Sequence, residues 1–245
     1  MCIRDRVLVF PDQELDFGEL EAVATAFGPI GEDPYFRPID GQSHVVALTR
    51  EADETSPLFA DVWHSDWSFL PTPPAGTLLY GVDIPPVGGD TLYADQYGAH
   101  DALPAALRDR IDGLQGIHSA RRGYAKQGLY GDRDVGRSMA IVASDDALAT
   151  QCHPLIRHHP ETGRPALFFS LAYTIGIEGL EEDEANALIG ELYPYVARDE
   201  HVLRHHWAPG MVVLWDNRCL LHSATGGYEG HRRELHRLTI AAPPG

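Results

Sequence analysis

The segment Trp63-His-Ser-Asp66 carries two side chains that could act together on a metal ion. His64 and Asp66 are separated by one residue. On a β-strand, residues two apart project from the same face, so an imidazole and a carboxylate can converge on one ion. This pair is common by chance and predicts a metal site only if a further ligand is found elsewhere.

His222 is the candidate for that third ligand. It closes the segment Trp215-Asp-Asn-Arg-Cys-Leu-Leu-His222, at the exit of a predicted strand. Two histidines and one carboxylate bind one face of iron(II) and leave the other positions open. A chelating 2-oxo acid can fill two of these positions and O₂ a third. The far carboxylate of that acid needs a cation, and the planar fork of an arginine such as Arg233 or Arg237 suits it.

The elements that must position these residues are mostly short strands between glycines and prolines. Asp16 can cap a helix from about residue 17 to 27, residues 95–112 are expected to be helical with a break at Pro104, and Glu181–Val196 reads as an amphipathic helix. Residues 119–140 lack periodicity and are expected to form a long surface loop, a candidate lid. The pattern predicts an antiparallel barrel or jelly roll. The expected strands are 7–10, 45–49, 76–82, 90–94, 166–170, 202–207, 211–215 and 235–241.

Composition limits the class of partner and compartment. The 245 residues suit one domain with a real core. The net charge of −17, with Lys126 as the only lysine, argues against nucleic acid. Three widely spaced cysteines support neither a disulfide framework nor a thiolate zinc site. No run of about 18 apolar residues and no apolar leader is present, so we expect a cytoplasmic protein without membrane contact.

Taken as a set, motifs spread along the chain resemble those of the taurine dioxygenase family, which includes herbicide-degrading 2-oxoglutarate dioxygenases. Their order and spacing agree from Val7 to Ile240. The matching segments are Trp63-His-Ser-Asp66, Pro73-Pro-Ala-Gly76, Gly88-Gly-Asp-Thr91, His158-His-Pro-Glu-Thr-Gly-Arg164, Trp215-Asp-Asn-Arg218, His222 and Arg232-Arg-Glu-Leu-His-Arg237.

This resemblance implies a mainly β protein with flanking helices, folded as a double-stranded β-helix (a cupin-like jelly roll). It implies that His64, Asp66 and His222 are the catalytic iron(II) ligands. Thr91 and Arg233 are then the hydroxyl and the cation that hold the far carboxylate of 2-oxoglutarate. Arg237 is similar to the arginine that holds the anionic head of the prime substrate. The implied reaction consumes 2-oxoglutarate and O₂, releases succinate and CO₂, and hydroxylates the substrate.

The resemblance also sets expectations about the whole chain. Residues 1–245 are expected to form a single dioxygenase domain that is truncated at the N-terminus, because family members carry a further segment before the strand matching Val7–Phe10. Family members commonly form homo-oligomers. The substrate is expected to be a small organic anion, namely a sulfonate, a sulfate ester or a carboxylate. Taurine itself is not assured, because the taurine enzyme is aligned to carry a histidine at about Ile39-Asp40, where this sequence has none, and the nearby His44 is out of register.

Two other functions are compatible with the same residues. A zinc-dependent hydrolase could use the two histidines and the carboxylate with a bound water, but it has no need of Thr91 and Arg233 at their positions. A non-catalytic relic of the barrel could bind a small anion. Release of succinate with iron(II), 2-oxoglutarate and O₂ distinguishes the dioxygenase from both.

Overall fold

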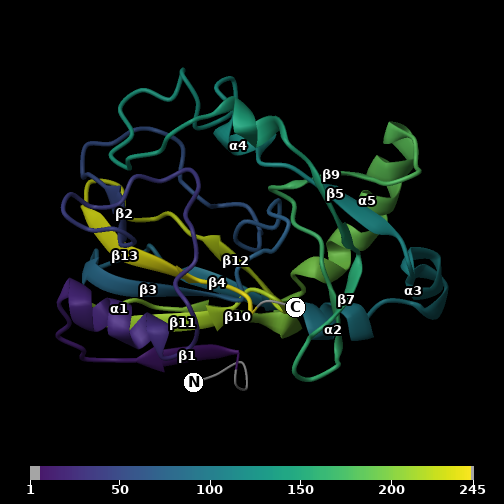
Figure 1. The fold of residues 1–245 in the computed structure, drawn as a ribbon, viewed down its shortest axis with the longest axis horizontal. Coiled ribbons are helices and arrows are strands. Elements are labelled where there is room, and N and C mark those ends of the chain that lie inside the picture. The colour runs from purple at the N-terminus through teal and green to yellow at the C-terminus, as the bar shows by residue number, and fades with distance from the viewer. Residues whose placement is uncertain (1–5, 244–245) are drawn as a thin grey trace.

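The computed structural model describes residues 6–243 (Figure 1). The chain is mainly β, and its strands pair antiparallel. The largest sheet has five strands in the order β1-β11-β3-β13-β2, and a three-stranded sheet has the order β10-β4-β12. Their bounds are β1 Val7–Phe10, β2 Val46–Arg50, β3 Gly76–Asp83, β4 Thr91–Asp95, β10 Val202–His205, β11 Val212–Asp216, β12 Leu220–Ala224 and β13 Arg233–Ile240.

These two sheets pack face to face and enclose an apolar core. Trp215, Leu79 and Leu235 contribute from the larger sheet, and Tyr93 and Leu220 from the smaller one. All five side chains are buried. Alternation along each strand sends one set of side chains into this core and the other set outward. The mainly β, jelly-roll prediction is confirmed.

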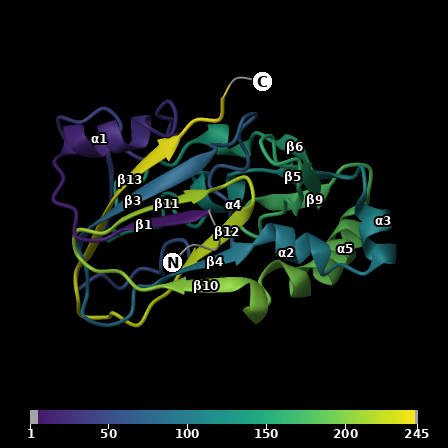
Figure 2. The ribbon, with the colours of Figure 1, turned by 90° about the horizontal axis from the view of Figure 1, so that it is seen from below.

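Helix α1 (Phe17–Thr25) covers the outer face of the larger sheet, as Figure 2 shows. Asp16 accepts a hydrogen bond from the Glu19 backbone N–H, and the Asp16 backbone N–H donates one to the Glu19 carboxylate, so the predicted cap is a full capping box. Leu20 and Ala24 pack on β3, β11 and β13. The apolar outward side chains of the sheet are thereby buried instead of facing water.

A second core lies beyond the smaller sheet, where α2 and α5 pack around short strands (Figure 1). Strands β6-β5-β9 form one small sheet, and β7 and β8 pair with each other. Among the described residues, no helix has both the length and the apolar character needed to cross a membrane. The elements are α2 Gln96–Asp101, α3 Ala105–Ile111, β5 Gln115–His118, β6 Gln151–Pro154, β7 Ile156–His158, β8 Pro165–Leu167, β9 Thr174–Ile177, α5 Glu182–Val196 and the 3₁₀ turns Asp145–Leu148 and Asp199–His201.

The expectation that residues 119–140 form a surface loop is partly wrong. The short helix α4 (Arg121–Tyr124) interrupts this segment, and Tyr124 is 1% exposed. Its ring stacks on that of Tyr35 with the centroids 4.7 Å apart. The buried aromatic ring anchors the segment over one end of the barrel, where Met139 joins the same apolar cluster.

Candidate metal centre

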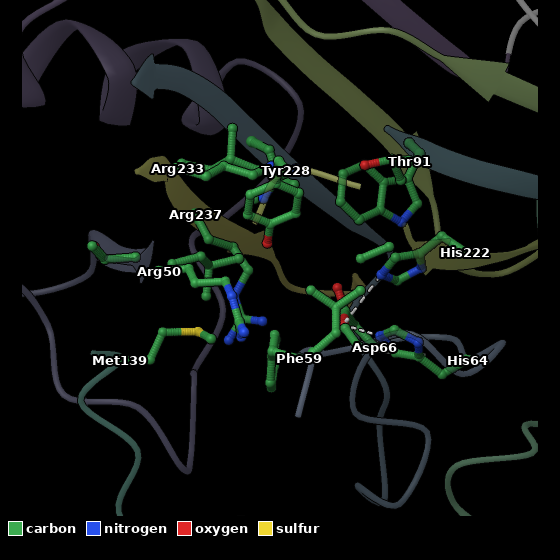
Figure 3. A pocket seen from close by; sticks show the side chains of 18 residues that line it. Arg50, Phe59, His64, Asp66, Thr91, Met139, His222, Tyr228, Arg233 and Arg237 are labelled. Carbon is green, nitrogen blue, oxygen red and sulfur yellow. Dashed lines mark ion pairs between the residues drawn. The ribbon is translucent and has the colours of Figure 1, made fainter. Parts of the chain in front are cut away.

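The side chains of His64, Asp66 and His222 meet inside one end of the barrel (Figure 3). Nε2 of each imidazole lies 3.7 Å from Oδ1 of Asp66. The two rings have their centroids 4.1 Å apart, and all three side chains are buried. One carboxylate oxygen and two imidazole nitrogens therefore converge on one point, and this donor set suits a divalent iron.

Two chain segments bring these residues together, although not in the way that the sequence predicted. His64 does not lie on a regular strand. It forms an isolated antiparallel bridge with His222 on β12, with backbone N···O distances of 3.0 and 2.8 Å. Asp66 lies in the turn that follows. Trp67 then adopts a left-handed conformation with φ of 48°, which is uncommon for a bulky side chain and is held here by complete burial.

A hydrogen bond orients His64 for a metal, whereas the buried Nδ1 of His222 has no partner among the described residues. Nδ1 of His64 donates to the carbonyl oxygen of Val62 at 2.7 Å, so Nε2 carries the free lone pair. Burial lowers the pKa of His222 to about 3 and also lowers that of His64. Burial raises the pKa of Asp66, but His222, Arg237, His64 and the Thr77 hydroxyl together outweigh it, and the net pKa is lowered. Neutral imidazoles and an ionised carboxylate are the protonation states that ligate metals.

A chain of buried hydrogen bonds orients Asp66. The Thr77 hydroxyl donates to Oδ2 of Asp66 at 2.6 Å, and the Asn217 amide donates to the Thr77 hydroxyl at 2.8 Å. Trp215 Nε1 in turn donates to the Asn217 side-chain oxygen at 3.0 Å. Oδ1 of Asp66 is thereby left facing the two histidines. Sequence reasoning gave no role to Thr77, because a buried threonine at a strand start carries no local signal, and it used Asn217 only as part of the matching segment Trp215-Asp-Asn-Arg218.

We expect Thr77→Val to weaken metal binding by roughly 10- to 100-fold while the protein remains folded. The change keeps the shape of the side chain but deletes the donor that fixes Asp66. Metal affinity measured by competition with a chelator provides the test. Thr239→Val is the matched control, because Thr239 faces Thr77 across β13 and β3 but its hydroxyl bonds the Glu32 carbonyl. Equal losses in both variants would contradict the role of Thr77.

Thr91 and Arg233 lie in the same cavity as the metal cluster. Nη2 of Arg233 donates to the Gly89 carbonyl at 2.9 Å, whereas its buried Nε has no partner among the described residues. Thr91 Oγ accepts from Trp207 Nε1 at 3.0 Å, so its own proton is free for an acceptor. Gly89 has φ of 69°, and a Cβ there would meet Arg233 Nε at 2.9 Å, so only glycine fits. A buried arginine that lines the cavity suits a carboxylate.

Arg237 also lines this cavity, as the spacing of the two arginines on β13 predicted. Figure 3 shows its guanidinium pointing into the space beside Asp66. However, Arg237 already forms an ion pair through Nη2 with Asp33, a residue that sequence reasoning did not select. Asp33 lies in the segment between α1 and β2, whose sequence has no pattern that would reveal this pairing.

A second, mainly apolar cavity adjoins the first. The two share Phe59, Ala60 and His64. Three tyrosines, Tyr124, Tyr130 and Tyr173, form much of its remaining wall. The ring of Tyr173 meets that of His64 edge-on, with the centroids 6.1 Å apart. The organic part of a ligand could therefore lie against aromatic rings next to the metal cluster.

A second cluster of potential ligands, His159, Asp216 and Cys219, is less suited to a metal. Arg218 donates to both carboxylate oxygens of Asp216, at 2.8 and 2.7 Å. His159 Nε2 lies 3.0 Å from the same carboxylate. Burial raises the pKa of Cys219 to about 12, so its thiol stays protonated. These contacts account for the cluster as a structural network.

Comparisons with known proteins match almost the full chain to one family. Residues 3–239 match the family described as taurine catabolism dioxygenase TauD, TfdA family. The chain is 33% identical to an (S)-phenoxypropionate/alpha-ketoglutarate-dioxygenase of Sphingobium herbicidovorans, with 97% of this chain and 83% of the relative covered. It is 35% identical to an alpha-ketoglutarate-dependent 2,4-dichlorophenoxyacetate dioxygenase of Cupriavidus pinatubonensis, with coverages of 95% and 83%.

A solved structure gives the same result for the fold. A taurine dioxygenase from Burkholderia xenovorans superimposes with a TM-score of 0.77 at 30% identity. The superposition covers 98% of this chain and 78% of that one. Fold and sequence thus point to the same group of proteins.

Proposed function

Since the chain belongs to the TauD, TfdA family and is an alpha-ketoglutarate-dependent dioxygenase, we propose that His64, Asp66 and His222 bind its iron(II) and that Arg233 and Thr91 bind 2-oxoglutarate. The observation that carries this proposal is the convergence of two imidazoles and a carboxylate in one cavity that a buried arginine also lines. A zinc hydrolase would not require that arginine, and no feature of the described residues favours hydrolysis.

Iron(II), when bound, supplies the activation of O₂ that converts 2-oxoglutarate to succinate and CO₂ and oxidises a substrate C–H bond. The chain supplies positioning. Arg233 and Thr91 fix the far carboxylate, so the 2-oxo acid end is directed to the histidine and aspartate cluster. Phe59 and Tyr173 form apolar walls beside His64, which exclude water from the reacting C–H bond.

We further propose that the substrate belongs to the small organic acids and sulfate esters. Support comes from the aryloxy acids named for two relatives, and Arg237 in the cavity wall can donate a hydrogen bond to an oxygen of such a ligand. The apolar second cavity favours a substrate with an aromatic or bulky apolar body over a small polar one. Aryloxy carboxylates, sulfonates and sulfate esters are therefore the first classes to screen.

The test is succinate release from purified protein supplied with iron(II), 2-oxoglutarate and O₂, with each candidate substrate added in turn. We expect succinate above the level without substrate for at least one class, and none when zinc replaces iron. Product formation that depends strictly on zinc and yields no succinate would replace the dioxygenase proposal with hydrolysis.

A further inference from the structure

The arginine that faces the substrate space carries its own buried counter-ion. Asp33 and Arg237 form an ion pair in which the side chains are 8% and 4% exposed. Arg237 lines the cavity of the metal cluster, whereas Asp33 lies behind it and is absent from the wall. A ligand in the cavity would therefore meet a guanidinium whose charge is already balanced from the other side.

Neighbouring side chains fix this arrangement without a ligand. Trp67 Nε1 donates to Oδ1 of Asp33 at 3.0 Å, the same oxygen that Arg237 contacts. The guanidinium carbon of Arg237 lies 4.5 Å from the centroid of the Phe36 ring and 4.8 Å from that of Trp67. Asp33 therefore cannot move away from Arg237 without losing its hydrogen bond from the buried indole of Trp67.

The ion pair with Asp33 changes which ligands Arg237 favours. Nη1 of Arg237 makes no hydrogen bond among the described residues and is not one of the fully buried polar atoms, so a donor remains for a ligand. An anion placed there gains a hydrogen bond but also meets the field of Asp33, and charges in a buried site interact far more strongly than in water. An uncharged acceptor, such as an amide or ester carbonyl, gains the hydrogen bond without that repulsion.

We propose that Asp33 is a specificity-determining residue that cancels the preference of the substrate site for a negative charge. The enzyme then binds an acid and its uncharged amide about equally well. This inference rests on the proposed function, because it takes the space beside Arg237 and the metal cluster as the substrate site. It concerns selection by charge, which the overall reaction does not determine.

The test compares wild-type protein with Asp33→Asn, which keeps the acceptor for Trp67 but removes the charge. Both proteins are loaded with manganese(II) and the inert co-substrate analogue N-oxalylglycine, and calorimetry then measures binding without turnover. The probes are (S)-2-phenoxypropionate and its primary amide, followed by aryl sulfonate and sulfonamide pairs of equal shape. Wild type should bind the two members of a pair within about tenfold of each other. Asp33→Asn should favour the acid at least about tenfold more than wild type does.

Two control variants separate this effect from a general change of charge or fold. Asp33→Glu keeps the carboxylate and should keep the wild-type ratio. Glu32→Gln removes the exposed neighbouring carboxylate and should also leave the ratio unchanged. The thermal unfolding midpoint and the N-oxalylglycine affinity show whether each variant keeps its site.

An unchanged acid-to-amide ratio in Asp33→Asn would overturn the inference. So would a failure of every acid to bind an Asp33→Asn protein that still binds manganese(II) and N-oxalylglycine, because the freed arginine would then not serve anions. If wild-type protein itself bound neither manganese(II) nor N-oxalylglycine, the proposed function would fall instead, and the result would be attributed to that premise.

Discussion

Replacing Asp66 by alanine is expected to abolish iron(II) binding and substrate-dependent succinate release. The change removes the single anionic ligand from the cluster and leaves two neutral imidazoles. The loss should exceed the roughly 10- to 100-fold effect of removing a residue that only supports a ligand. Metal content after dialysis and succinate yield are the two measurements, and His64→Ala should give the same result.

Asp53→Ala provides the control for a lost carboxylate, because Asp53 is exposed and lies before the metal cluster in the chain. We expect wild-type iron content and succinate yield from it. A thermal unfolding midpoint for Asp66→Ala near that of wild type would show that the fold survives. Iron content and succinate yield at the wild-type level in Asp66→Ala would remove Asp66 from the metal site.

Replacing Arg233 by alanine is expected to raise the concentration of 2-oxoglutarate needed for half-maximal rate by roughly 10- to 150-fold. The change deletes one charge-assisted pair with the far carboxylate, worth about 1.5–3 kcal/mol. The rate at saturating 2-oxoglutarate should change much less, since Arg233 does not contact the metal ligands. Initial rates across a 2-oxoglutarate titration separate the two quantities.

Arg232→Ala is the matched control for Arg233→Ala. Arg232 is the adjacent residue, but its guanidinium is partly exposed and pairs with Glu51, Asp83 and Glu234. Its loss should leave the 2-oxoglutarate requirement unchanged. An unaltered requirement in Arg233→Ala, or equal shifts in both variants, would exclude Arg233 as the carboxylate partner.

Local sequence patterns predicted the elements that carry clear signals. The helix after Asp16 and strands β3 and β13 appear where capping residues and alternating apolar residues indicate them. Strand β12 was missed because no glycine or proline marks the three residues between β11 and β12. The chain turns there through Asn217, whose side chain is held by Trp215 and Thr77. The contact between Asn217 and Thr77 joins residues far apart in sequence, and no local pattern encodes it.

The site shows the same division between what local patterns predict and what they do not. The structure brings into one cavity the side chains that the sequence motifs singled out. They are His64, Asp66, His222, Arg233 and Arg237. The strand expected for His64 and Asp66 is a bridge followed by a turn, so the convergence has a different geometric cause. Asp33 and Thr77 were not selected, because each matters only through a partner that the fold brings to it.

A crystal structure of the protein with manganese(II) and N-oxalylglycine would test the central claim most directly. Anomalous scattering would locate the metal independently of the protein ligands. We predict manganese bound by His64, Asp66 and His222, with the far carboxylate of N-oxalylglycine paired with Arg233 and bonded by the Thr91 hydroxyl. A metal at His159, Asp216 and Cys219 instead, or a far carboxylate turned away from Arg233, would contradict the assignment.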